Sequence, residues 1–265
     1  MFKDITLGQY FPGNSPIHRL DPRTKLLLMI AYIAAVFLVQ DMWLFLAVGA
    51  FAAGVTLLAR VPASYLWRSL KPLRLILLFM FVLNLLMIQT GDTLFHWGFL
   101  RITEGGLRQA FYISFRLILL VGGTSLVTLT TTPIALTDGL ERLLSPLAVF
   151  RFPAHELAMI MTIALRFIPT LLEEADKIMK AQLSRGADLE SGNIFQRAKA
   201  MVPILVPLFI SSFRRADELA MAMESRCYHG SEGRTRMHVL RFSRRDGLAA
   251  AVTLGLIVLI LLAQA

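Results

Sequence analysis

The sequence has a single cysteine, Cys227, among its 265 residues, so no disulfide can form within the chain. A lone thiol is typical of a region that faces a reducing compartment. Charged residues are also few, at 17%, whereas 56% of the residues are hydrophobic and the mean hydropathy is +0.63. This composition is too apolar for a soluble domain of this size and predicts an integral membrane protein.

The sequence also has little that could carry out catalysis. The histidines are dispersed without the spacing of metal ligands: His18, His96, His155, His229 and His238. No Gly-x-x-x-x-Gly-Lys-Ser/Thr loop occurs, so we expect this chain to bind no ATP, and we expect no cofactor or metal. Paired carboxylates or a histidine dyad at membrane depth are also lacking, which makes an integral membrane enzyme only a distant alternative.

Five apolar runs predict membrane-spanning helices and hence an all-α membrane protein. They cover residues 26–39, 44–59, 73–88, 110–129 and 248–263. Several are shorter than the roughly 20 residues of a full span, so we expect flanking residues to extend them. Gln40 and Asp41 predict a tight turn between the first two runs. The segment before the first run lacks the apolar core of a signal peptide, so this run is expected to remain as an anchor.

The net charge of +9 is distributed in a way that indicates membrane topology rather than nucleic-acid binding. Most basic residues gather in alternate segments between the apolar runs, which would lie on one side of a membrane. Sixteen of the 27 Lys and Arg lie within residues 131–246. The positive-inside rule then predicts a cytoplasmic N-terminus and an outside C-terminus. We therefore expect residues 1–130 to form an N-terminal segment and four spans, 131–246 a cytoplasmic domain, and 247–265 the last span.

The cytoplasmic domain is expected to contain two long amphipathic helices, at about 155–183 and 204–225. Glu173–Lys177 and Asp176–Lys180 would be i,i+4 ion pairs on the polar side of the first helix. Pro203 and Pro207 are expected to start or bend the second.

Each of these helices ends in a similar tripeptide, Ser184-Arg185-Gly186 in the first and Ser225-Arg226-Cys227 in the second. Small neighbours leave each guanidinium uncrowded, and a guanidinium can hold a carboxylate by two parallel hydrogen bonds. Two such endings predict a paired docking device for a soluble partner. The alternative is that both helices lie along the headgroups and that their arginines bind anionic lipid.

These residues resemble the transmembrane T component of energy-coupling factor transporters, whose two coupling helices end in Ala-Arg-Gly-like motifs. Segments 15–25 (SPIHRLDPRTK), 185–193 (RGADLESGN) and 213–224 (FRRADELAMAME) are similar to the family's first-span entry, helix link and second coupling helix. The similarity covers essentially the whole chain. It departs from the typical motif in Ser184, Ser225 and Cys227.

The resemblance implies a non-catalytic subunit of a vitamin or micronutrient importer in a prokaryotic cell membrane. Arg185 and Arg226, with their flanking residues, would dock two cytoplasmic ABC-type ATPases, which bind the ATP. A membrane-embedded, substrate-binding S component would pack against apolar residues of the coupling helices: Phe167, Leu171, Ile178, Phe209, Phe213 and Met223. The motifs look like those of a module shared by several S components, and a T component dedicated to cobalt, nickel or biotin is the alternative.

The sequence offers two interpretations for each of two further residues, Arg116 and Cys227. Arg116 lies within the fourth apolar run, where it could be functional or could extend to the outer interface. Cys227 is interpreted as a packing residue rather than a redox-active one.

Overall fold

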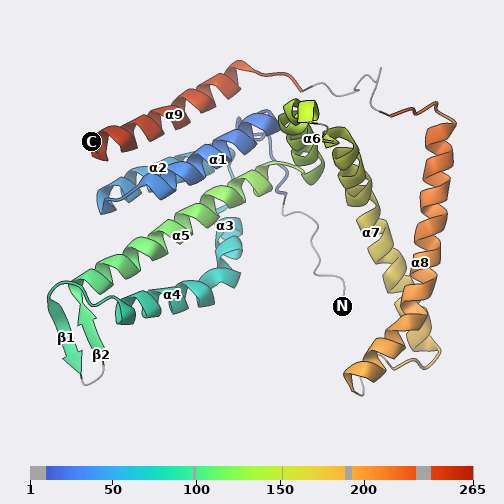
Figure 1. Cartoon of the computed structure of the whole chain (residues 1–265), viewed down its shortest axis with the longest axis horizontal. Helices are drawn as coiled ribbons and strands as arrows, with labels where there is room; N and C mark the ends of the chain where they lie inside the picture. Colours follow the sequence, from blue (N-terminus) through green and yellow to red (C-terminus); the bar gives the residue numbers. More distant parts are fainter. Residues whose placement is uncertain (1–9, 98–99, 151, 189–192, 231–239, 265) are drawn as a thin grey trace. The chain divides into compact units, whose positions relative to one another are not determined.

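The computed structural model describes residues 10–97, 100–150, 152–188, 193–230 and 240–264 (Figure 1). In chain order the elements are α1 (Pro22–Leu38), α2 (Met42–Ala59), α3 (Ala63–Leu70), the 3-10 helix η1 (Lys71–Leu73), α4 (Arg74–Met87), β1 (Thr93–Trp97), β2 (Leu100–Thr103), α5 (Glu104–Thr130), α6 (Pro133–Leu144), the 3-10 helix η2 (Ser145–Phe150), α7 (Ala154–Ser184), α8 (Ile194–Glu224) and α9 (Arg244–Gln264). The chain forms two compact units. The bundle unit comprises the described residues of 10–143 and 240–264, and the α7–α8 unit comprises those of 144–230.

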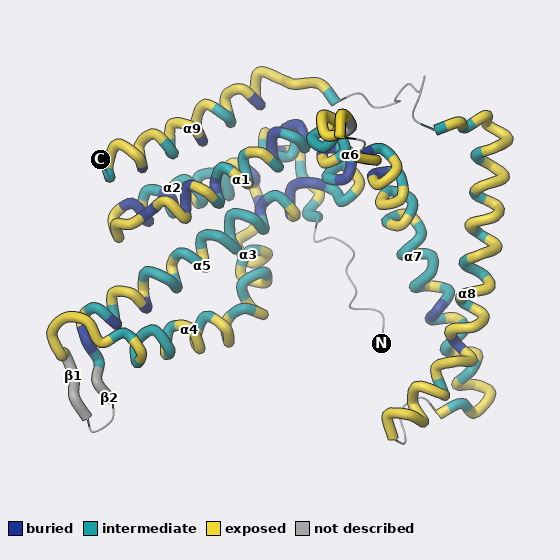
Figure 2. The backbone as a smooth tube through the Cα atoms, in the orientation of Figure 1, coloured by how far each residue is buried: buried dark blue, intermediate teal, exposed yellow. Residues whose placement is uncertain are grey.

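In the bundle unit, α1, α2, α5 and α9 pack around a small apolar core. The buried residues of this core are Tyr32, Ala35, Val36, Val39, Leu44, Phe45, Val48 and Ile260. The predicted turn at Gln40 and Asp41 joins α1 to α2. Buried residues form only short patches along the helices in Figure 2, and apolar side chains such as Trp43 and Leu57 are 81% and 78% exposed. Such an outward apolar surface suits a lipid environment, since it would be costly in water.

The predicted all-α membrane class is confirmed. Six helical stretches in the described residues are long and apolar enough to cross a membrane: Met42–Ala59, Ala63–Met87, Glu104–Thr130, Ala154–Ser184, Ile194–Glu224 and Arg244–Gln264. Four of them contain predicted spans. The first predicted span forms α1, with 17 residues. The other two are α7 and α8, so their cytoplasmic location stays a prediction.

Two features of the bundle unit differ from the predicted elements. The third span is preceded by α3 and the short helix η1, where Pro72 interrupts regular α-helical bonding. Between α4 and α5, the antiparallel strands β1 and β2 pair Thr93 with Thr103 and Trp97 with Leu100. Neither short strand has a hydrophobic alternation long enough to be recognised in the sequence.

The α7–α8 unit contains the two predicted long helices. The bounds of α7 agree with the predicted 155–183 within one residue at each end. The predicted start of the second helix is wrong, because α8 begins at Ile194 and includes Pro203 and Pro207. Asn193 and Gln196 form a capping box there, which satisfies the first backbone N–H groups. In Figure 1 the axis of α8 changes direction in its first half, where the prolines lie.

Candidate docking site at the ends of α7 and α8

The first arginine tripeptide ends α7 in a sharp turn. Gly186, directly after Arg185, has a left-handed backbone with φ +83°. The N–H of Gly186 donates to the Leu183 carbonyl at 3.0 Å, and the N–H of Ala187 donates to the Gln182 carbonyl at 3.0 Å. These two bonds form a Schellman motif, which satisfies the last carbonyls of a helix. Arg185 is therefore the last residue before the chain leaves the helix direction.

The second tripeptide ends α8 in the same motif. The N–H of Cys227 donates to the Glu224 carbonyl at 2.9 Å, and the N–H of Tyr228 donates to the Met223 carbonyl at 3.1 Å. Cys227 takes the left-handed position with φ +54°. For a residue with a Cβ this conformation costs on the order of 1 kcal/mol. Cys227 thus replaces glycine at the position where glycine is most favoured.

The serines before the arginines turn back onto their own helices. The hydroxyl of Ser184 donates to the Lys180 carbonyl at 3.0 Å, and that of Ser225 donates to the Ala222 carbonyl at 3.1 Å. Each hydroxyl proton is therefore used within its helix. This explains how serine can stand where the family's motif has alanine.

The arginines themselves point outward. Both Arg185 and Arg226 are exposed, as are Gly186 and Cys227. Within the described part of the chain neither guanidinium forms an ion pair or a side-chain hydrogen bond. Each is thus a cation at the negative end of a helix dipole, with its N–H donors available to a partner.

The two arginines lie at opposite ends of an antiparallel helix pair. At one end the Gln182 amide donates to the Pro203 carbonyl at 3.4 Å. At the other end the Tyr228 hydroxyl lies 3.0 Å from the sulfur of Met159. Because Arg226 lies 23 positions after Pro203, the two helix ends that carry the arginines lie on the order of 35 Å apart.

A hollow of about 540 Å³ adjoins the second end. It is lined by Met159 and Ile163 from α7 and by Met223, Arg226 and Tyr228 from the end of α8. Arg226 therefore borders a concave surface. Arg185 instead precedes an open turn, since nothing lies within 4 Å of the position that a Cβ on Gly186 would take. The two ends share their backbone geometry but not their surroundings.

Polar contacts hold α7 and α8 together between these ends. The carboxylate of Glu174 on α7 accepts hydrogen bonds from Ser211 and Arg215 on α8, the latter at 2.6 Å. Ala175 and Ile204 are among the few buried residues of the pair. The predicted Asp176–Lys180 pair is confirmed at 2.6 Å, and it lies on α7 alone.

The predicted S-component-facing residues divide between the two helices. Phe167, Leu171 and Ile178 of α7 are half-buried, as is Met223 of α8. Phe209 and Phe213 are 66% and 60% exposed, and their rings lie 5.2 Å apart. Further exposed apolar residues surround them on α8: Val202, Leu205, Val206 and Ile210. The apolar surface of the pair is thus concentrated on α8.

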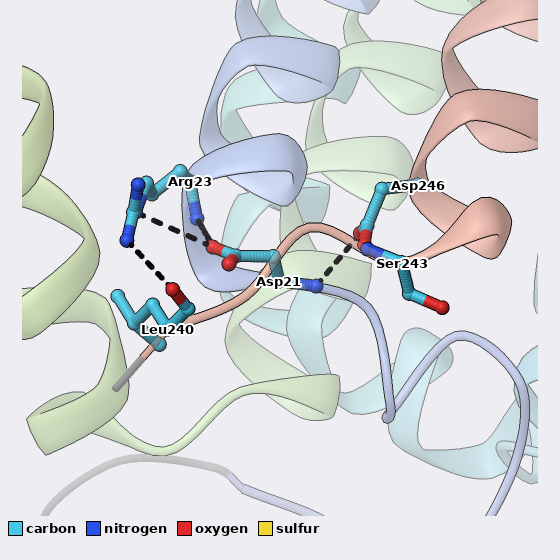
Figure 3. A network of polar contacts seen from close by, with 5 residues as sticks. All are labelled: Asp21, Arg23, Leu240, Ser243 and Asp246. Carbon is cyan, nitrogen blue, oxygen red and sulfur yellow. Dashed lines mark hydrogen bonds and ion pairs between the residues drawn. The ribbon is translucent and has the colours of Figure 1, made fainter. Parts of the chain in front are cut away.

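The entry segment before α1 has a structural role that the sequence did not predict (Figure 3). The buried carboxylate of Asp246 accepts from the backbone N–H of Asp21 at 2.8 Å and from that of Ser243 at 2.7 Å. Asp21 caps α1 by accepting from the N–H of Arg23 at 2.9 Å. The guanidinium of Arg23 reaches the Leu240 carbonyl at 3.3 Å. This network ties the start of α1 to the start of α9, and its sequence signal was the Ser-x-x-Asp capping pattern at 243–246.

Lys25 completes the connection to the end of α5. Its buried ammonium donates to the carbonyls of Thr130 and His18 and to the hydroxyl of Thr131, at 2.9, 3.2 and 2.9 Å. All three of its donors are used. The segment that resembles the family's first-span entry therefore works as a structural junction.

Arg116 also has a structural explanation. Its guanidinium donates to the Val39 carbonyl at 2.9 Å and to the Tyr112 hydroxyl at 2.6 Å. It also lies 5.7 Å from the centre of the Phe37 ring. A cation at the C-terminal end of α1 is favoured by the helix dipole, and here it satisfies a carbonyl that the helix leaves open.

Comparison with known proteins supports the assignment that these residues suggested. A family model described as "CbiQ: Cobalt transport protein" matches residues 13–239. Three relatives bear the name "Energy-coupling factor transporter transmembrane protein EcfT". The protein of Acidaminococcus fermentans is 56% identical over 98% of this chain and 97% of its own length, and that of Clostridium kluyveri is 53% identical over 100% and 98%. The protein of Bacillus subtilis is 50% identical over 98% and 97%. By these matches the chain belongs to the T components, the non-catalytic transmembrane subunits of energy-coupling factor transporters.

Proposed function

We propose that this T component couples two cytoplasmic ATPases to a membrane-embedded S component through the α7–α8 pair. The observation that carries the proposal is the matched geometry of the two helix ends. Each presents an exposed arginine directly before a left-handed residue, so each guanidinium projects from a blunt helix end. Two helix ends of like backbone geometry suit like binding sites on two ATPases.

The arginines would bind acidic residues of the ATPases. A guanidinium can donate two parallel hydrogen bonds to one carboxylate, which fixes direction as well as distance. Lysine provides a single mobile ammonium and would hold the helix end less firmly. With the pair held at both ends, a change in the separation of the ATPases would displace α7 and α8 as levers.

The S component would receive that displacement on the apolar side of α8. Phe209 and Phe213, with the exposed aliphatic residues around them, offer an unpartnered apolar surface within the described part of the unit. The contact across Glu174, Ser211 and Arg215 would make α7 follow α8, so that both helices transmit the movement. ATP binding and substrate binding would belong to the partners.

The module is proposed to be of the shared type, because the relatives over almost the full length bear the general transporter name rather than that of one substrate. The cobalt in the family description does not assign a substrate to this chain. Affinity purification in mild detergent separates the two types. Two ATPases with several small membrane proteins support a shared module, whereas a single S component supports a dedicated one.

The docking assignment is tested by charge reversal at both ends. Arg185→Glu with Arg226→Glu is expected to abolish ATPase co-purification and vitamin uptake while the protein stays in the membrane fraction. Arg214→Glu is the matched control, because Arg214 is an exposed arginine of α8 away from either end. Normal assembly and uptake in the double variant would reject the assignment and leave lipid binding by the helix pair as the better explanation.

A further inference from the structure

The bundle unit contains an apolar groove that the coupling mechanism does not use. It has a volume of about 320 Å³ and lies among α1, α2, α5 and α9. Its walls include Leu28, Phe51, Leu126, Ala249 and Val252. The volume lies at the lower end of the range for small-molecule sites, which runs from about 300 to 1,000 Å³.

Basic side chains line one end of the groove, where Lys25, Thr130 and Arg245 lie. The ammonium of Lys25 donates to the Thr130 carbonyl, and Asp246, next to Arg245, accepts from the N–H of Asp21 at the start of α1. The hydroxyl of Thr253, farther along α9, donates to the Ala249 carbonyl within its own helix. The opposite end is closed by the ring of Tyr32, which lies against Gly123 and stacks on Phe51 with ring centres 6.2 Å apart. An occupant would therefore need an anionic group at one end and an apolar body behind it.

Arg245 is the cation available to such an occupant. The ammonium of Lys25 is already bonded to three oxygens. Arg245 is exposed, and among the described residues its guanidinium has no ion-pair or hydrogen-bond partner. The neighbouring carboxylate of Asp246 is used by two backbone N–H groups instead. The guanidinium of Arg245 thus places a positive charge at this end of the groove, with its N–H donors available to an anionic group.

The groove is long and mostly apolar. From Arg245 to Thr253 it follows α9 over about 12 Å. A single acyl chain is narrow and elongated, so it suits a groove of this length and lining.

We propose that this groove binds one acyl chain of an anionic phospholipid, with its phosphate on Arg245. The site is independent of the docking ends, since it belongs to the bundle unit alone. A lipid held here would fill the space between α9 and the other helices and would fix the position of α9 in the bundle. It would also make assembly of this chain depend on anionic lipid.

Native mass spectrometry of the detergent-purified full chain tests the site with phosphatidylglycerol and phosphatidylcholine at equal concentration. Wild-type protein is expected to retain one phosphatidylglycerol preferentially. Ala249→Phe fills the groove and should abolish this retention, whereas Ala251→Phe, at an exposed position of the same helix, should not. Arg245→Gln should lower the preference for phosphatidylglycerol about fivefold, as expected for one lost charge at a membrane surface. Arg244→Gln, next to it but outside the groove, should leave the preference unchanged.

Several outcomes would overturn the proposal. Equal retention of both lipids by the wild type would remove the role of charge, and equal effects of Arg244→Gln and Arg245→Gln would make it non-specific. Ala249→Phe with normal lipid retention but impaired binding of a partner protein would assign the groove to that partner. Size-exclusion chromatography would detect a failure of Ala249→Phe to fold. The two arginine variants would then still distinguish specific lipid binding at Arg245 from non-specific attraction of anionic lipid to basic residues.

Discussion

Gly186 and Cys227 occupy the same left-handed position of two Schellman motifs, with φ of +83° and +54°. Each follows an exposed arginine and ends a 31-residue helix. The sequence similarity of the two tripeptides is thus a similarity of backbone conformation. The third residue of each tripeptide must adopt a left-handed backbone, which favours glycine. The second residue, the arginine, supplies the exposed positive charge.

Cys227→Gly is expected to stabilise the end of α8 by about 1 kcal/mol, because glycine adopts the left-handed region without the steric cost of a Cβ. Gly186→Ala is the matched opposite change, expected to destabilise the end of α7 by a similar amount. No other atoms crowd the site of its added Cβ, so the cost would be conformational. Hydrogen exchange of the amides of residues 186–187 and 227–228 measures both. Faster exchange in Cys227→Gly would contradict the assignment of strain.

Asp246→Ala is expected to destabilise the bundle unit by about 3 kcal/mol, because it leaves the N–H groups of Asp21 and Ser243 without their acceptor. Asp246→Asn retains one side-chain oxygen as an acceptor and should cost about half as much. Thermal unfolding in detergent measures the effect. Asp217→Ala, which removes an exposed carboxylate from α8, is the control and should change little. Equal stability of the Asp246 and Asp217 variants would show that the junction carries no stability.

Arg116→Leu is expected to lower the free energy of unfolding by about 2 kcal/mol, since the Val39 carbonyl and the Tyr112 hydroxyl lose a charged donor. Arg108→Leu changes an exposed arginine of the same helix and serves as the control. A structural role predicts that uptake per folded transporter stays normal in Arg116→Leu. Uptake that falls while thermal stability is unchanged would instead assign Arg116 to the transport cycle.

Patterns of the sequence predicted much of the architecture. The length and amphipathic period of 155–183 predicted α7 within one residue, and the apolar runs predicted α2, α4, α5 and α9. The predicted start of α8 was ten residues too late because the prolines were interpreted as a helix boundary. The capping box at Asn193 instead stabilises a helix start at Ile194. Proline disfavours a helix interior by a few kcal/mol, which packing and capping elsewhere can offset.

Contacts between distant segments could not be predicted from the sequence. Asp21 and Asp246 are 225 residues apart, and no periodic pattern relates them. Arg116 was left open for the same reason, since its partner carbonyl belongs to the end of another helix. In the docking site, the residue types of both tripeptides were recognised, but the left-handed conformation of Cys227 required the backbone.

A double-mutant cycle between Glu174 and Arg215 is expected to measure a coupling energy of about 1 kcal/mol across α7 and α8. The ion pair is 2.6 Å long, but its side chains are 24% and 36% exposed, so solvent screening keeps the energy modest. Asp176 and Lys180 form a pair of equal length within α7 alone. Removing the Asp176–Lys180 pair should not change the packing of α7 against α8, whereas removing the Glu174–Arg215 pair should weaken it. Hydrogen exchange at the contact between the two helices would measure this difference.

Phe209→Ser with Phe213→Ser is expected to abolish co-purification of the S component while the ATPases are retained, because it removes two large exposed rings from the apolar side of α8. Leu254→Ser, which changes an exposed apolar residue of α9, is the control. Quantitative mass spectrometry of the purified complexes reads out both partners in one sample. Loss of both partners would indicate that α8 itself is disrupted, and hydrogen exchange along α8 would then detect the disruption directly. Retention of the S component, with normal hydrogen exchange along α8, would reject this surface as its binding site. That result would not affect the assignment of Arg185 and Arg226 to ATPase docking, which the charge-reversal variants test separately.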